Sequence, residues 1–231
     1  MVDESRYARQ TMLPPFGPEG QKKLSEAKVL LVGVGGLGSP VSTYLTAAGV
    51  GRLGLVDADV VSLTNLQRQV LYSEAEIGML KVNCAKKRLL ALSSHTQIDT
   101  YPFFFTEENA KEILSQYDVV VDGCDNYATR FLIDEVSKEL NRPYIYGSIG
   151  EFFGQVSVFN YKNGPRYSDL YSKEELKDKK AVKGVLGPVP GVIGAMEAIE
   201  CIKVITGMGE SLSGRLLTMD LLTMQMNEFA I

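Results

Sequence analysis

A glycine-rich turn between an apolar run and a helical stretch is the feature that most constrains how this chain can fold. The turn Gly33-Val34-Gly35-Gly36-Leu37-Gly38 directly follows the apolar residues 29–32. Glycines at such a turn let the backbone approach phosphate groups at the N-terminus of the next helix. Asp57 ends a second apolar run nineteen residues beyond Gly38, where a carboxylate can accept hydrogen bonds from ribose hydroxyls. This spacing predicts a strand, a turn, a helix and a second strand that together hold a nucleotide.

Strand and helix patterns alternate along the first 150 residues. Strand patterns occur at 29–32, 53–57, 97–101, 118–122 and 143–146. Apolar residues at helical spacing predict helices at about 38–48, 79–92, 107–114 and 127–140. This alternation is typical of a Rossmann-like, doubly wound α/β fold with a mainly parallel sheet.

The pattern changes after Gly150. Strands are predicted at 154–161, 215–220 and 224–229, and a buried helix at 191–206. The last strands would extend the sheet in antiparallel fashion. With an N-terminal arm and short helix over 1–26, and no linker or internal repeat, residues 1–231 are expected to form a single domain.

One stretch fits neither pattern. Residues 172–180 are highly charged, and the composition favours a solvated, mobile loop. The alternative is a crossover loop, over 168–186, that lies above the active site and becomes ordered when a partner protein docks.

Composition excludes several classes of protein. The net charge of −4 gives no reason to expect nucleic acid as a partner, and no apolar run approaches the ~18 residues of a membrane span. The N-terminus lacks the order of a signal peptide, so a cytoplasmic protein is expected. His95 is the only histidine; it is expected at the surface, and it makes histidine-based acid–base chemistry unfavourable.

Further motifs follow the glycine turn in a fixed order: Asp57-x-Asp59, Asn65-Leu66-Gln67-Arg68-Gln69, Lys81 and Asp125-Asn126. Together with that turn they resemble the ThiF/MoeB/HesA family of ATP-dependent adenylyltransferases, bacterial relatives of ubiquitin-activating enzymes. The segments 6–10 and 187–191 resemble that family too, so the resemblance runs from about Arg6 to Phe229.

The resemblance implies a reaction. The C-terminal glycine carboxylate of a ubiquitin-like sulfur carrier ending in Gly-Gly would attack the α-phosphate of ATP, and pyrophosphate would leave. The product would serve sulfur incorporation in thiamine, molybdopterin or related biosynthesis. No general base is needed, since the nucleophile is already an anion at neutral pH.

The resemblance also assigns roles to residues. Arg68, Lys81, Asp125 and Arg9 would be catalytic. Asp57 would hold the ribose, while Asn65, Arg68 and Lys81 would bind phosphates, to which a planar guanidinium and a compact ammonium are suited. The complete ATP-binding set would be Gly33, Gly35, Gly36, Gly38, Asp57, Asp59, Asn65, Leu66, Gln67, Arg68, Gln69, Lys81, Asp125 and Asn126.

Two of these roles have alternatives in the sequence. Asp125 would coordinate Mg²⁺, which prefers carboxylate and phosphate oxygens, but it could instead cap the following helix. Arg9 would complete the ATP site of the other subunit in a homodimer, although an N-terminal arginine can also be a solvated charge.

Other functions stay open at this point. A superfamily adenylase acting on tRNA or on a peptide, and a carrier-binding module without catalysis, would keep the same fold. The acidic balance gives little support to tRNA. An NAD oxidoreductase is the alternative at the level of the fold alone.

The chain departs from many members of the family in its cysteines. Arg166 and Asp169 stand where one zinc-binding Cys-x-x-Cys pair would fall, and the second pair would lie past Phe229, so no zinc is expected. The stretch 177–187 contains no cysteine that could link to a carrier.

The three cysteines therefore yield a first prediction. Cys84 and Cys201 lie in helical patterns and are expected in the core, while Cys124 is expected to be a small buried thiol at a strand end. Mass spectrometry of a trapped reaction should find this chain without a thioester or persulfide. A covalent adduct at any of the three would contradict the prediction.

Overall fold

A mixed eight-stranded sheet forms the centre of the computed structural model, which describes residues 4–176 and 184–231. The strand order is β3-β2-β1-β4-β5-β6-β7-β8. The strands β1 to β5 pair in parallel, and β5 to β8 pair in antiparallel fashion, as the sequence predicted. Their bounds are β1 (Lys28–Val32), β2 (Arg52–Val56), β3 (Gln97–Tyr101), β4 (Val119–Asp122), β5 (Tyr144–Gly150), β6 (Phe153–Phe159), β7 (Arg215–Asp220) and β8 (Gln225–Ala230).

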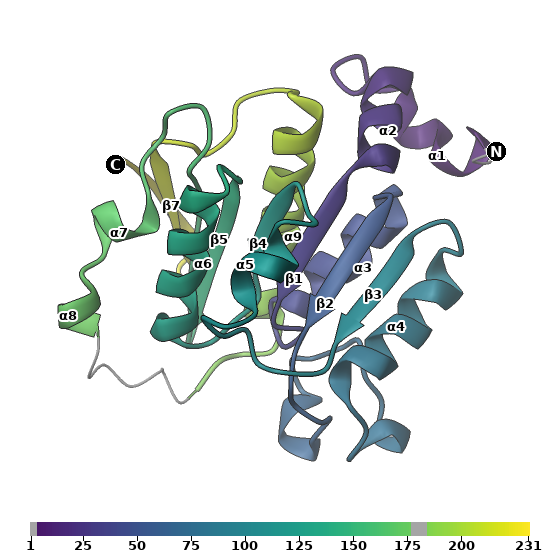
Figure 1. Cartoon of the computed structure of the whole chain (residues 1–231), viewed down its shortest axis with the longest axis horizontal. Coiled ribbons are helices and arrows are strands. Elements are labelled where there is room, and N and C mark those ends of the chain that lie inside the picture. Colours follow the sequence, from purple (N-terminus) through teal and green to yellow (C-terminus); the bar gives the residue numbers. More distant parts are fainter. Residues whose placement is uncertain (1–3, 177–183) are drawn as a thin grey trace.

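Helices cover both faces of this sheet (Figure 1). They are α1 (Glu4–Thr11), α2 (Gly17–Glu26), α3 (Gly38–Ala48), α4 (Lys81–Leu92), α5 (Ala110–Leu114), α6 (Tyr127–Glu139), α7 (Tyr167–Leu170), α8 (Lys173–Leu176) and α9 (Pro188–Thr206), with 3-10 turns η1 (Leu63–Asn65) and η2 (Glu74–Glu76). No helix in the described ranges is long and apolar enough to cross a membrane.

Two buried clusters divide the core, one on each face of the sheet. In β1, Val29 and Leu31 pack with α2, α3, α4 and α9, whereas Leu30 and Val32 pack with α5, α6 and α7. Successive side chains of a strand point to opposite faces, so a continuous apolar run is what a strand covered on both sides requires. Cys84 and Cys201 lie in the first cluster, as predicted, and His95 is exposed.

Several element boundaries differ from the prediction. β5 continues to Gly150 instead of stopping at Tyr146, because its later residues pair with β6. α9 begins at Pro188 rather than at residue 191, since a proline is tolerated in the first turn of a helix. The helices predicted from 79 and 107 begin at Lys81 and Ala110.

The segment predicted as a loop over 168–186 contains ordered structure at both of its ends. The short helices α7 and α8 occupy its beginning, and a parallel bridge joins Val185 to Glu151. Residues 177–183, which include most of the stretch without cysteine, lie outside the described residues.

An aromatic cluster anchors the start of this segment. The fully buried Tyr167 ring contacts the rings of Phe131, Tyr144, Tyr146, Phe159 and Tyr171. The carboxylate of Asp134 accepts hydrogen bonds from the Tyr167 backbone N–H (2.9 Å) and from Arg166 (2.8 Å). Packing and a buried carboxylate therefore fix α7 to α6.

A buried acid stands out on α9. Glu197 is fully buried, and neither carboxyl oxygen has a hydrogen-bond partner in the described structure. It fills the space beside Gly147, where a side chain would collide with it. Burial raises its pKa well above the ordinary value, and the nearby charge of Asp122 adds to the shift while Arg130 opposes it. Burial therefore favours the neutral, protonated form of Glu197.

This environment predicts a pH-dependent effect of Glu197→Gln. When the pH rises above about 4.3, the ordinary pKa of glutamate, the unfolded chain loses the Glu197 proton while the folded protein keeps it. The free energy of unfolding therefore falls as the pH rises above this value. The amide has no proton to lose. As the pH is raised from about 5, urea unfolding should show the variant gaining stability relative to the unsubstituted protein, by up to about 1.4 kcal/mol per pH unit. Parallel pH profiles for the two proteins would contradict this prediction.

Candidate active site

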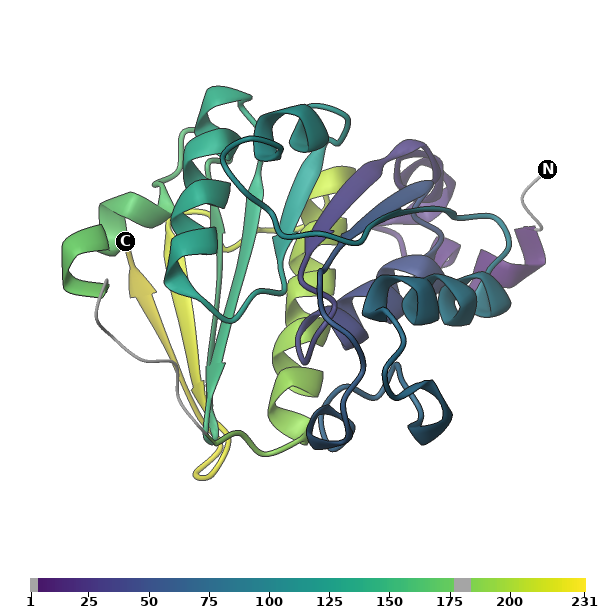
Figure 2. The same ribbon diagram turned by 60° about the horizontal axis from the view of Figure 1, so that its bottom comes forward.

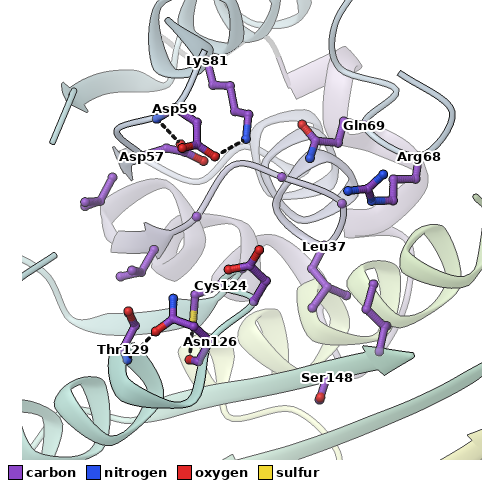
Figure 3. A pocket seen from close by; sticks show the side chains of 18 of the residues that line it. Leu37, Asp57, Asp59, Arg68, Gln69, Lys81, Cys124, Asn126, Thr129 and Ser148 are labelled. Carbon is purple, nitrogen blue, oxygen red and sulfur yellow. Dashed lines mark hydrogen bonds and ion pairs between the residues drawn. The ribbon is translucent and has the colours of Figure 1, made fainter. Parts of the chain in front are cut away.

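A cavity with a volume of about 670 Å³ lies at the carboxyl ends of the parallel strands. The loops after β1, β2 and β4 form its walls together with the segment 64–69, the start of α4 and the end of β5. Eleven of the residues predicted to bind ATP line it: Gly33, Gly35, Gly36, Asp57, Asp59, Gln67, Arg68, Gln69, Lys81, Asp125 and Asn126. Residues from five separate segments thus converge on one site (Figure 3).

The glycine turn forms the floor of this cavity. Gly33 has a φ of +91°, a conformation that favours glycine, and a Cβ there would collide with the carbonyl of Gly123 in the loop after β4. Gly38 does not line the cavity. It lies under the turn, where a Cβ would collide with the Gly33 carbonyl oxygen. The glycines therefore bring two loops and the start of α3 into close contact.

Asp57 connects this turn to the end of β2. One carboxylate oxygen accepts a hydrogen bond from the Val34 N–H (2.9 Å), and the other accepts one from the Asp59 N–H (2.8 Å). Burial raises the pKa of Asp57, while Lys81 and these two N–H groups act in the opposite direction. The carboxylate is therefore fixed beside the cavity in one orientation.

Lys81 extends into the cavity from the first residue of α4 (Figure 3). Its ammonium lies 2.8 Å from the carboxylate of Asp59, and its backbone N–H donates to the Asp59 carbonyl oxygen (3.0 Å). Lys81 is only 4% exposed, whereas Asp59 is exposed. The ammonium is thus held in place by a neighbour that solvent also reaches.

The segment after η1 supplies a second cation. Arg68 is half-buried, and one of its terminal nitrogens donates to the Thr64 carbonyl (3.1 Å). Gln69 is buried beside Gly35, and its side-chain carbonyl oxygen has no partner in the described ranges. Asn65 and Leu66 do not line the cavity. The Asn65 carbonyl instead accepts the backbone N–H groups of Arg68 (3.0 Å) and Gln69 (2.9 Å), which shapes the turn that presents both side chains.

The loop after β4 contributes a carboxylate to the cavity. Asp125 is exposed at the cavity. The N-cap of α6 is Asn126, whose side chain accepts the Thr129 N–H (2.9 Å), so the alternative role of Asp125 as the cap is not the one observed. The described residues include no group of three or more His, Cys, Asp or Glu that could hold a metal. A metal at Asp125 would need ligands from a bound molecule.

Sequence reasoning missed two parts of the cavity. Phe103, Phe104 and Phe105, which follow β3, form an aromatic wall; their uninterrupted run was a signal that could have been used. On the other side lie Ser148, Ile149 and Gly150 at the end of β5. No sequence pattern places these last residues at the site, because the strand was predicted to end before them.

A buried ionic network under the β4 loop was also missed. Asp122 is fully buried and accepts hydrogen bonds from the Arg130 Nε (2.9 Å), the Tyr144 hydroxyl (3.0 Å) and the Cys124 thiol (2.8 Å). Arg130 lines the cavity and also donates to the Cys124 carbonyl (3.0 Å). The network fixes the backbone that leads into Asp125.

Cys124 lines the cavity and is only partly buried as a residue. Burial raises the pKa of its thiol well above the ordinary value, and the charge of Asp122 raises it further. A thiol held protonated is a poor nucleophile.

Arg9, the remaining predicted catalytic residue, lies on α1, is exposed, and does not line the cavity of its own chain. Figure 1 shows α1 at the end of the sheet opposite to the segment between β2 and α4.

Comparison with known proteins agrees with this arrangement. Residues 7–231 match the model of the ThiF family. A sulfur carrier protein adenylyltransferase of Thermus thermophilus is 45% identical over 225 residues, covering 94% of this chain and 83% of that protein. A probable molybdopterin-synthase adenylyltransferase of Porphyra purpurea is 41% identical over 235 residues, covering 100% of this chain and 62% of that protein. The chain thus spans less than two thirds of the length of that second relative.

A solved structure has the same fold over nearly the whole chain. The crystal structure of E. coli MccB with ATP matches with a TM-score of 0.82 and 25% sequence identity, covering 97% of this chain and 71% of that chain. The family model and the Thermus relative together decide the assignment: this chain belongs to the ThiF family.

Proposed function

We propose that this protein uses ATP to adenylate the C-terminal glycine carboxylate of a small ubiquitin-like sulfur-carrier protein, with release of pyrophosphate. The observation that carries the proposal is the convergence of Arg68, Lys81 and Asp125 on one cavity above a glycine turn. Two cations and a carboxylate around a close backbone approach suit a polyphosphate with its metal ion.

The cavity has a distinct wall for each part of ATP. The phenylalanines after β3 offer an apolar surface for the base. Asp57, at the end of β2, lines the same cavity and would hold the ribose. Figure 3 shows Lys81 beside Asp57 and Asp59, and Arg68 near the other end of the turn, so that a cation stands at either place the phosphates would reach. A triphosphate can engage both cations, whereas the pyrophosphate of NAD is commonly bound by the glycine turn and the helix N-terminus.

Positioning and charge would supply the catalysis. The attacking carboxylate is an anion without help from a base, so the site has to align it with the α-phosphate and stabilise the charge that develops on the phosphate oxygens. The only histidine, His95, lies outside the cavity lining, and the Cys124 thiol is held protonated, so the fixed cations are the groups suited to the chemistry.

Mg²⁺ fits the donor set of the site. Asp125 is exposed at the cavity and is not used as a helix cap, so its oxygens are available, and phosphate oxygens and water would complete the coordination. Bound there, the ion would neutralise phosphate charge. Asp122 and Arg130 would hold the loop that carries Asp125.

A sulfur carrier is favoured over a tRNA or a peptide as the substrate. The relative that is named a sulfur carrier protein adenylyltransferase is 45% identical to this chain. The MccB structure shares the fold but is only 25% identical to this chain, so it is the weaker guide to the substrate. A carrier of this kind presents an extended tail ending in Gly-Gly. The product would feed sulfur incorporation in thiamine, molybdopterin or related biosynthesis.

ATP–pyrophosphate exchange tests the reaction. With Mg²⁺ and a carrier ending in Gly-Gly, the protein should catalyse exchange that depends on the carrier. Lys81→Met removes the ammonium but keeps the apolar stem, and should lower the exchange rate by about 10²- to 10³-fold, the usual effect of losing a group that stabilises transition-state charge. Lys87→Met is the matched control, because Lys87 lies on the exposed side of the same helix. Exchange by Lys81→Met at the unsubstituted rate would refute the assignment.

We further propose a homodimer in which Arg9 completes the site of the neighbouring subunit, since Arg9 is exposed and remote from its own cavity. Arg9→Ala and Lys81→Met should each inactivate the protein. Mixing the two variants under conditions that exchange subunits should restore about a quarter of the activity, because half of the dimers are mixed and each mixed dimer has one intact site. If Arg9 acts within its own chain, mixing restores nothing.

A further inference from the structure

Glu197 on α9 is a buried acid that the proposed reaction does not use. Its side chain is fully buried, and neither carboxyl oxygen has a hydrogen-bond partner among the described residues. The next acid of the same helix differs, because Glu200 accepts the Leu212 backbone N–H (2.8 Å) and pairs with Lys203. Leaving a polar group unpartnered in the interior costs free energy. Packing alone therefore does not account for an acid at position 197.

Glu197 lies against the strand that forms one wall of the cavity. Figure 2 shows α9 (light green) alongside the strands β4 and β5, against which it packs. A Cβ at Gly147 of β5 would collide with the Glu197 carboxyl group, so the acid occupies the space that a side chain there would need. Ser148, the next residue of β5, lines the cavity. Glu197 thus packs on the β5 backbone directly before the cavity wall.

The same glycine is tied to the loop after β4. The Gly147 carbonyl accepts a hydrogen bond from Arg130 (3.2 Å). Arg130 also donates to the Cys124 carbonyl (3.0 Å) and pairs with Asp122 (2.9 Å). It belongs to α6, which covers the opposite face of the sheet from α9 (Figure 1). Arg130 therefore connects the backbone on which Glu197 packs to the loop that leads into the proposed metal ligand.

The charged groups around Glu197 come from three elements. Burial raises its pKa, the carboxylate of Asp122 from β4 adds to the shift, and the guanidinium of Arg130 from α6 opposes it. Cys201 lies one turn along α9. The packed elements α3 and β6 contain no Asp, Glu, Lys, Arg, His or Cys, the charged side chains of α2 are exposed, and the tyrosines of β5 belong to the core cluster on the opposite face. Loss of the Glu197 proton would place a second buried negative charge beside a pair that holds one positive charge.

We propose that Glu197 is a positioning residue: with its proton it leaves Arg130 to hold the cavity wall, and release of that proton to solvent switches the adenylation reaction off. A carboxylate at position 197 would attract Arg130 away from the carbonyl groups of Gly147 and Cys124. The loop after β4 would then lose its fixed position beside β5, and with it the alignment of the substrate carboxylate with the α-phosphate. This inference rests on the proposed function and adds a control by pH.

The pH dependence of carrier-dependent pyrophosphate exchange tests this control. From about pH 6 to about pH 10, the rate of the unsubstituted protein should fall at least about 10-fold relative to that of Glu197→Gln, because the amide has no proton to lose. Glu200→Gln changes a buried but partnered acid of the same helix, so this matched control should keep the alkaline fall. Near-ultraviolet circular dichroism should show each protein folded over this range. A constant ratio, or a fall confined to the pH at which the unsubstituted protein unfolds, would overturn the proposal.

Infrared spectroscopy provides a second measurement that needs no variant. With ¹³C-labelled glutamate, the absorption of a protonated glutamate carboxyl group in the folded protein should disappear over the same pH range as the exchange activity. Loss of activity without a change in this absorption would overturn the proposal even where Glu197→Gln does not fold. Absence of carrier-dependent exchange at every pH would instead reject the proposed function, so the two failures are distinguishable.

Discussion

The close approach of the loops after β1 and β4 is the contact on which the site depends. Gly33 lies so close to Gly123 that neither position has space for a Cβ. Gly38 packs against the carbonyl group of Gly33 and has no space for a Cβ either. Hard-sphere contacts of this kind leave the backbone no alternative path. They fix the glycine turn, the start of α3 and the strand end that precedes Asp125 relative to one another. The polar groups of the site are then attached to a rigid frame.

Charged and polar networks hold the remaining walls to this frame. Asp57 binds the glycine turn and the Asp59 backbone at the same time, and Asp59 in turn holds Lys81. On the other wall, Asp122 and Arg130 connect the β4 loop to β5. The bonds of Asp57 to Val34 and Asp59, and of Arg130 to Gly147, use a backbone N–H or carbonyl as one partner, so this part of the geometry depends on the path of the chain.

Much of the fold was predictable from local patterns. The strands β1, β2 and β4 are apolar runs covered on both faces, and the alternation of strands and helices predicted that the strands pair in parallel, which the sheet confirms for β1 to β5. Boundaries were less predictable. β5 continues through Gly147 and Gly150, residues that weaken a strand pattern, because pairing with β6 supports them. Of the cavity residues, those within compact motifs were foreseen. Ser148 and Arg130 were not, because only tertiary structure brings the end of β5 and the first turn of α6 to the same cavity.

The ion pair between Lys81 and Asp59 gives the cavity a selectivity of its own. A lone lysine in a half-enclosed cavity would attract any small anion, whereas this one already has a carboxylate 2.8 Å away. A small inorganic anion from solvent would have to displace the Asp59 carboxylate from Lys81, and it would gain few other contacts in return. A triphosphate can replace the lost interaction and engage Arg68 and the glycine turn as well. The pair therefore favours ligands that fill the whole cavity over fragments that resemble only one part of them.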